Sequence, residues 1–119
     1  MSRIAYVDGR YLPIRARAVR IEDRGLQFAD GVYEVIKCLA GRICDLERHL
    51  NRLERSLAAL AIPMPASRAA LKAIIGATLR RNGLRDALIY LQVDRGAAPI
   101  LRTAGSAHER AVAHPPQLM

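Results

Sequence analysis

The segment at residues 21–36, IEDRGLQFADGVYEVI, constrains the fold of this chain more than any other. It places an acidic pair, an arginine and two glycines ahead of residues that favour extended backbone. Gly25 and Gly31 permit backbone dihedral angles that other residues avoid, whereas the valines and isoleucine of residues 32–36 favour a strand. We therefore predict a loop that turns at the glycines and leads into a strand, with Tyr33 near its start.

The residues near the N-terminus predict an antiparallel hairpin. Asp8 and Gly9 lie between two short apolar segments within residues 3–14, and both residue types tolerate positive φ in a two-residue turn. Pro13 has no amide hydrogen, so the second strand must end there or lie at a sheet edge. Further strands are predicted at residues 19–21, at 32–39 and 42–46 as a second hairpin, and at 88–93.

Two helices are predicted between the second hairpin and the last strand. Leucines recur at helical spacing through residues 46–62, with Asp45 as the expected cap. Ser67 is the expected N-cap of a second helix, which Asn82 and Gly83 close. The last strand is mostly apolar and suits a central position with both faces covered. The sequence thus predicts an α+β domain with a mainly antiparallel sheet and two helices.

The character of the sequence changes after Pro99. Residues 100–119 have no sustained hydrophobic period, contain a Pro-Pro pair and end without a capping pattern. A chain of 119 residues has the size of one domain with a modest core. We therefore expect residues 1–99 to form that domain and residues 100–119 to be a divergent, disordered tail.

Charge and composition exclude several classes of partner. The net charge is +8, but the arginines are scattered, many stand beside an acid, and no aromatic platform accompanies them, so we expect no nucleic-acid partner. No apolar run approaches the roughly 20 residues of a membrane span. Without a secretory segment we expect a cytoplasmic protein with free Cys38 and Cys44 thiols, although these two could face each other across the second hairpin. The histidines lack metal-ligand spacing, and we expect no metal.

Several segments together resemble the N-terminal small domain of fold-type IV pyridoxal 5'-phosphate (PLP) enzymes, the class IV aminotransferases. They are IEDRGLQFADGVYEVI, GRICDLERHLNRLERSL, AIPMP and LRDALIYLQVDRGAAP, within roughly residues 4–99. The string QFADGVYE resembles the D-amino acid aminotransferases more than the branched-chain aminotransferases or aminodeoxychorismate lyases. The resemblance implies PLP as cofactor, amino-group transfer between a D-amino acid and a 2-oxo acid, and a homodimer.

The resemblance also implies the residues of a binding site. Arg52, in the string HLNRL, corresponds to the arginine that binds the PLP phosphate, for which a planar guanidinium is well suited; on its own it would be an ordinary helix-surface arginine. Tyr33 corresponds to the tyrosine that binds the substrate carboxylate through its hydroxyl. Val35, on the same strand face as Tyr33, and Lys37, at the rim, would line the substrate pocket.

The family chemistry requires a lysine that forms a Schiff base with PLP, and in the family this lysine belongs to a larger second domain. Neither Lys37, on a predicted strand, nor Lys72, on the second predicted helix, suits that role. Arg102 and His108 have the residue types of the family's carboxylate clamp at the wrong spacing. We therefore expect no catalytic residue, a truncated form without the large domain, and no activity of the chain alone. The alternative is a non-catalytic fragment or a partner-binding module.

Overall fold

The computed structural model describes residues 3–96 and, for the backbone alone, residues 108–114. In chain order the elements are β1 (Ile4–Val7), β2 (Arg10–Pro13), α1 (Arg24–Phe28), β3 (Gly31–Leu39), β4 (Arg42–Ile43), α2 (Leu46–Ala59), α3 (Arg68–Asn82), β5 (Ala87–Asp94) and β6 (His108–His114). The strands form one antiparallel sheet in the order β2-β1-β6-β5-β3-β4. This architecture confirms the predicted α+β class.

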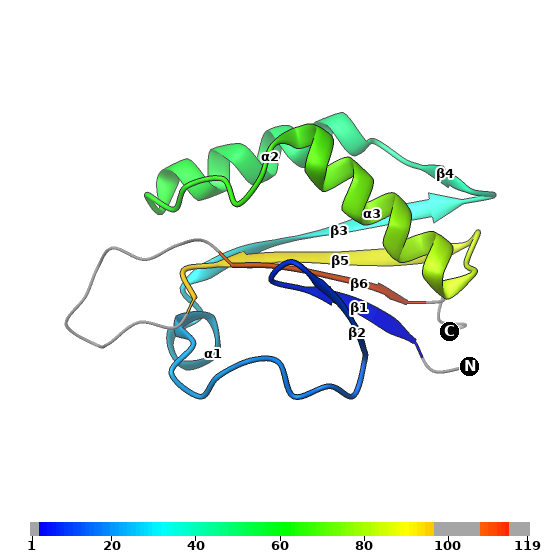
Figure 1. The fold of residues 1–119 in the computed structure, drawn as a ribbon. Coiled ribbons are helices and arrows are strands. Elements are labelled where there is room, and N and C mark those ends of the chain that lie inside the picture. Colours follow the sequence, from blue (N-terminus) through cyan, green and yellow to red (C-terminus); the bar gives the residue numbers. More distant parts are fainter. Residues whose placement is uncertain (1–2, 97–107, 115–119) are drawn as a thin grey trace, which may run out of the picture.

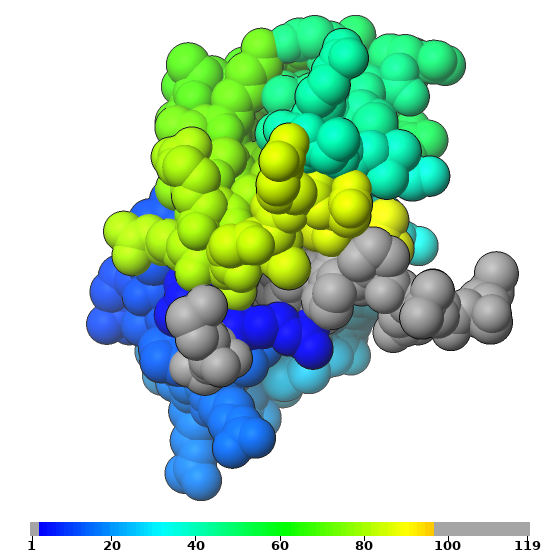
Figure 2. Space-filling model, turned by 90° about the vertical axis from the view of Figure 1, so that its right-hand side faces the viewer, coloured from blue at the N-terminus to red at the C-terminus, as the bar shows by residue number. Residues whose placement is uncertain are grey.

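The two long helices cover one face of the sheet, whereas α1 and the segment before it run along the opposite side (Figure 1). Figure 2 shows the same layers, with the helices in green above the sheet and the residues between β2 and β3 in blue below it. The core lies between the helices and the sheet. Its fully buried apolar side chains are Ile36, Cys38, Leu50, Leu53, Leu57, Leu71, Ile75, Ile89, Leu91 and Val93.

Local sequence signals account for most of the element boundaries. The turns at residues 8–9 and 40–41 have positive φ throughout, as both predicted hairpins require. Ser67 Oγ accepts a hydrogen bond from the Ala70 amide, and Gly83 ends α3 in the left-handed conformation at φ 62°. Asp45 precedes α2 as expected, but it has φ 54° and its side chain makes no capping hydrogen bond. The leucine stripe of α2 is buried against the sheet.

The prediction of a disordered tail was wrong for residues 108–114. They form β6, which pairs with β1 on one side and β5 on the other and so lies inside the sheet. The segment HERAVAH has only three apolar residues in a row, and its pairing partners are distant in sequence, so local periodicity gives no sign of it. The rest of the segment assigned to the tail, residues 100–107 and 115–119, lies outside the described residues.

Three other predictions also failed. Residues 19–21 do not form a strand. Gly25 lies in α1 and Gly31 in β3, and neither has positive φ; the left-handed residue of this segment is Ala29, at φ 54°. The two long helices cover one face of β5, whereas on its other face Asp94 alone is buried, so that face is not part of the core. Cys38 and Cys44 are free thiols, as expected.

Candidate functional site

A cluster of three polar side chains joins α2 to β3. The Glu34 carboxylate accepts hydrogen bonds from Arg52 Nε, at 2.9 and 3.1 Å to its two oxygens, and from Arg52 Nη2 at 2.7 Å. His49 Nδ1 lies 2.7 Å from Oε1 of the same carboxylate. Because an ionised carboxylate only accepts hydrogen bonds, Nδ1 is the donor in this contact. One buried carboxylate thus binds two side chains of α2, those of Arg52 and His49.

The charges in this cluster stabilise one another. Burial by itself raises the pKa of the Glu34 carboxyl, but hydrogen bonds from Arg52 and His49, together with the charges of those groups, outweigh burial and bring the pKa below its ordinary value of 4.5. The same contact with Glu34 raises the pKa of the Arg52 guanidinium. Glu34 is therefore ionised and Arg52 charged at neutral pH.

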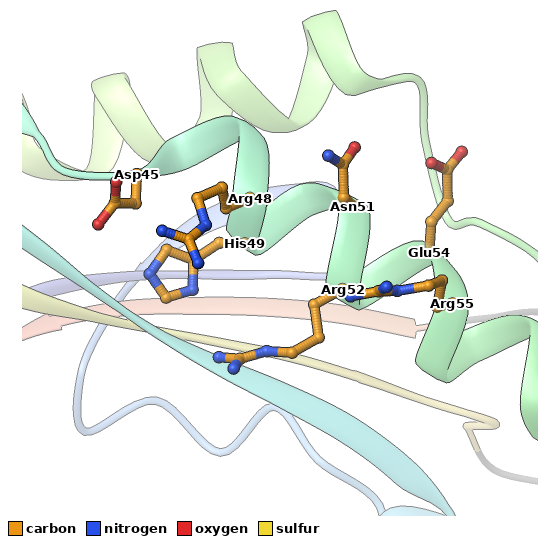
Figure 3. Close-up of a pocket in the computed structure, with 7 residues that line it drawn as sticks. All are labelled: Asp45, Arg48, His49, Asn51, Arg52, Glu54 and Arg55. Atoms are coloured by element: carbon orange, nitrogen blue, oxygen red, sulfur yellow. The ribbon is translucent and has the colours of Figure 1, made fainter.

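A surface hollow of about 740 Å³ runs along α2 beside this cluster. Arg52 and His49 point from the helix toward β3, whereas Asn51 and Glu54 point away from that strand (Figure 3). Arg68 binds the side chains of both Asn51 and Glu54 and so neutralises the Glu54 carboxylate. The three arginines of the lining therefore supply most of the charge in the hollow. Such a lining suits an anion. The lining residues are Asp45, Arg48, His49, Asn51, Arg52, Glu54 and Arg55.

The opposite face of the sheet carries an aromatic and polar row in which Tyr33 was predicted as a site residue but its neighbours on β5 were not. The Tyr33 and Tyr90 rings stack with centroids 5.4 Å apart and planes at 13°. Tyr90 Oη donates to Gln92 Oε1 at 3.1 Å, and Gln92 Nε2 donates to Asp94 Oδ2 at 3.1 Å. Polar residues at every second position of a mainly apolar strand, YLQVD, are the signal that could have revealed this row. Tyr33 itself is 62% exposed.

The predicted site residues lie on two faces of β3. Tyr33, Val35 and Lys37 share the face that the long helices leave uncovered, whereas Arg52 binds Glu34 on the helical face. The structure therefore does not bring Arg52 and Tyr33 together on one face. β4 pairs with only the last two residues of β3, so the rest of β3 is a sheet edge between the two faces. A ligand would have to reach around this edge to contact both residues.

Neither lysine is in a desolvated environment. Lys37 is exposed on the open sheet face, and Lys72 on α3 forms an ion pair with Glu47 of α2. A lysine that attacks a carbonyl must first lose its proton, which burial or a neighbouring cation promotes. Both lysines are exposed instead.

A second charged cluster holds the turn that precedes β3. Asp30 Oδ2 accepts hydrogen bonds from Arg24 Nε at 2.8 Å and from Arg95 Nε at 2.9 Å. The hydrogen bond from Arg24 is the main reason that the pKa of Asp30 lies below its ordinary value of 3.8, and Arg95 lowers it further. Arg95 follows β5, so this cluster ties α1, the start of β3 and the end of β5 together. It thereby sets the position from which Tyr33 projects.

Two common kinds of feature are not found in the part of the chain that the structure describes. Residues 3–96 contain no group of three His, Cys, Asp or Glu side chains arranged to hold a metal ion. No helix among the described residues is long and apolar enough to cross a membrane. The site thus consists of an arginine-lined hollow on one side of β3 and an aromatic row on the other.

The sequence of this chain matches a known protein family. The sequence model of the family described as amino-transferase class IV matches residues 31–117, and the chain belongs to this family. The match continues past Pro99, where the sequence analysis ended the resemblance, and it includes the strand β6.

The similar proteins include aminotransferases named for D-alanine and for branched-chain amino acids. The chain is 45% identical over 92 residues to a D-alanine aminotransferase of Bacillus licheniformis, an alignment that covers 77% of this chain and 32% of that protein. It is 35% identical over 95 residues to a putative branched-chain-amino-acid aminotransferase of Methanocaldococcus jannaschii, which covers 80% of this chain and 33% of the relative. The chain thus spans about a third of the length of these curated relatives.

Solved structures show the same fold. The branched-chain amino acid aminotransferase of Escherichia coli superimposes with a TM-score of 0.89 over 98% of this chain and 40% of its own, at 19% identity. This confirms the architecture of a class IV aminotransferase small domain.

Proposed function

We propose that this chain forms the small domain of a PLP-dependent aminotransferase that transfers an amino group between a D-amino acid and a 2-oxo acid. The observation that carries the proposal is Arg52, which Glu34 holds at the edge of an arginine-lined hollow. The D-alanine aminotransferase relatives support the D-amino acid as substrate. We propose that the domain includes β6 as well as residues 3–96, because β6 completes the sheet.

The residues of the hollow fit a phosphate group. Arg52 Nη1 has no hydrogen-bond partner within residues 3–96, so part of the guanidinium remains available, and Arg48 and Arg55 line the same hollow. When bound, PLP would supply an electron sink for the reacting carbon of the substrate. Arg52 would hold its phosphate. On the other face, Tyr33 would orient the substrate carboxylate, and Val35 and Lys37 would line the side-chain pocket.

We further propose that the chain alone does not catalyse transamination. Its only lysines are Lys37 and Lys72, which are solvated or ion-paired, so the lysine that holds the cofactor must come from a larger domain. Treatment with PLP and borohydride, followed by peptide mass mapping, should leave both lysines unmodified beyond the level of a denatured control. A single lysine labelled in the folded state alone would contradict this proposal.

Binding of the cofactor phosphate is the direct test of the site. We would titrate the full chain with PLP and with pyridoxal, which lacks the phosphate, and expect saturable binding of PLP alone. Arg52→Gln should weaken PLP binding by about tenfold, whereas Arg81→Gln, on α3 and outside the hollow, should leave it unchanged. Equal affinity for PLP and pyridoxal would contradict the proposed phosphate site.

A second candidate substrate is a branched-chain amino acid, which the relative in Methanocaldococcus jannaschii favours. One solved relative was crystallised with N-(5'-phosphopyridoxyl)-L-glutamate, and analogous adducts of D-alanine and L-leucine would serve as probes here. We expect the chain to bind the D-alanine adduct more tightly. Preference for the L-leucine adduct would select the branched-chain alternative.

We also propose that the chain forms a homodimer. The α1 helix buries none of its own residues, and Leu26 and Phe28 on it, with Ile21 before it, are exposed apolar side chains. A second copy would remove this apolar surface from water. Sedimentation equilibrium should show a dimer that Phe28→Glu dissociates, whereas Leu60→Glu, at the far end of α2, should leave it intact. A monomeric wild-type chain would refute the dimer.

A further inference from the structure

The guanidinium of Arg52 has two edges that can each form a pair of hydrogen bonds. Nε and one hydrogen of Nη2 form the side edge, and Nη1 with the second hydrogen of Nη2 forms the end edge. Glu34 occupies the side edge through Nε and Nη2. Within residues 3–96 Nη1 donates no hydrogen bond, so the end edge stays available on a side chain that lines the hollow.

The protein holds the side chain of Glu34 more firmly than that of Arg52. The Glu34 side chain is 5% exposed, whereas that of Arg52 is 59% exposed. Glu34 belongs to the long strand β3, where it stands opposite Leu91 of β5, and His49 gives its carboxylate a second donor. His49 and Arg52 are three positions apart and therefore share one side of α2. Glu34, a buried acceptor that binds two donors, thus fixes the otherwise solvated side chain of Arg52.

We propose that Glu34 is a positioning residue for anion binding, which holds Arg52 by its side edge so that the end edge is presented to a phosphate group in the hollow. The inference rests on the proposed function of Arg52. A free arginine side chain has many rotamers, and their loss opposes binding. Because Glu34 orders the guanidinium before a ligand arrives, the ligand does not have to order it.

The charge of Glu34 acts in the opposite direction. A carboxylate beside the hollow repels a phosphate, and if Glu34 only neutralised Arg52, its removal would strengthen anion binding. If Glu34 positions Arg52, removal of Glu34 should weaken anion binding. If Glu34 only neutralises Arg52, its removal should strengthen anion binding. The sign of the change therefore separates the two roles.

Glu34→Gln is the decisive substitution, since it removes the charge and keeps the shape of the side chain. The matched control is Glu54→Gln, which removes one negative charge from the same hollow but leaves the Arg52 contact intact. By titration calorimetry of the full chain with PLP, we expect Glu34→Gln to weaken binding by about three- to tenfold. We expect Glu54→Gln to bind PLP as tightly as the wild type or more tightly.

The titration separates failure of the inference from failure of the proposed function. If the wild type binds PLP and pyridoxal equally, both fail. If the wild type binds PLP through its phosphate and Glu34→Gln binds it as tightly or more tightly, the positioning role alone is overturned. Equal weakening by Glu54→Gln would overturn it as well.

Nuclear magnetic resonance gives a test that does not depend on a folded variant. In the wild-type chain, the Arg52 Nε hydrogen should exchange slowly with water, because Glu34 holds it, and its chemical shift should stay the same when PLP is added. The resonances of the Nη hydrogens should shift on addition of PLP. A rapidly exchanging Nε hydrogen, or one that PLP displaces, would overturn the positioning role.

Discussion

Asp94 packs directly against Gly31, its partner in the register between β3 and β5. A Cβ atom on Gly31 would lie 2.6 Å from the Asp94 Cβ and 2.7 Å from the Val93 carbonyl oxygen, closer than such atoms approach one another. A Cβ atom added to Gly25 would likewise overlap the carboxylate of the same aspartate. Both glycines are thus required for close approach of the chain rather than for unusual dihedral angles.

Gly31→Ala should lower the free energy of unfolding by about 2 kcal/mol, because the added methyl group meets backbone atoms that cannot rotate away. Gly76→Ala is the matched control within α3. There the nearest atom is the flexible Arg80 Nη1 at 3.1 Å, and alanine favours the helix by up to about 1 kcal/mol. Urea unfolding should give opposite signs for the two variants; the same sign in both would contradict the packing argument.

Asp30 should make the stability of the chain depend on pH. Arg24 and Arg95 lower the pKa of Asp30 in the folded state, so the stabilisation is present above the ordinary carboxyl pKa and is lost as the pH falls through the lower folded-state value. At pH 7, Asp30→Asn should lower the free energy of unfolding by about 2 kcal/mol. The difference from the wild type should shrink below about pH 4. A pH-independent difference would exclude the ion pairs as its source.

The stacked pair of Tyr33 and Tyr90 should contribute a measurable coupling energy. A double-mutant cycle with Tyr33→Ala and Tyr90→Ala should give about 0.5 to 1 kcal/mol in the free energy of unfolding. Tyr11 provides the control, since its ring packs on Tyr6 instead. Tyr33→Ala and Tyr11→Ala should be additive, and a coupling between Tyr33 and Tyr90 no larger than in this control would show that the stacking contributes nothing.

Asn82 should be more important for stability than an ordinary helix-end asparagine. Its Oδ1 accepts from the Ile4 amide and its Nδ2 donates to the Ile4 carbonyl, both at 2.9 Å. Asn82→Ala should cost about 2 kcal/mol, because it leaves two backbone groups of β1 without their partner. Asn51→Ala, whose exposed amide oxygen binds only Arg68, should change stability by less than about 0.5 kcal/mol. Thermal unfolding followed by circular dichroism would compare them, and equal losses would rule out a special role for Asn82.

The parts of the fold that the sequence predicted are those controlled by neighbours in the chain. The turn at Asp8 and Gly9, the cap at Ser67 and the end of α3 at Gly83 each depend on the dihedral angles or side chain of one or two residues. The leucine stripe of α2 depends on spacing alone. The expected capping bond of Asp45 failed, because the backbone there adopts φ 54° in a tight connection from β4.

The site was predictable only in part. Tyr33 and Arg52 were selected through resemblance to a family, because their residue types alone are ordinary for a strand and a helix surface. Glu34 was not selected, because an acid between Tyr33 and Val35 on a strand resembles a solvated residue. Its burial depends on His49 and Arg52, which lie 15 and 18 positions further along the chain.

The sequence by itself determined the two long helices, the hairpins, the α+β class and the family, since each follows from short-range stereochemistry or from motifs within a continuous segment. Only the tertiary structure decided that β6 lies between β1 and β5, that Gly25 and Gly31 make room for Asp94, and that Glu34 binds Arg52. These features join segments that are distant in the chain. Their energies arise from backbone pairing, exclusion of volume and burial of charge, which exist only after the segments have met.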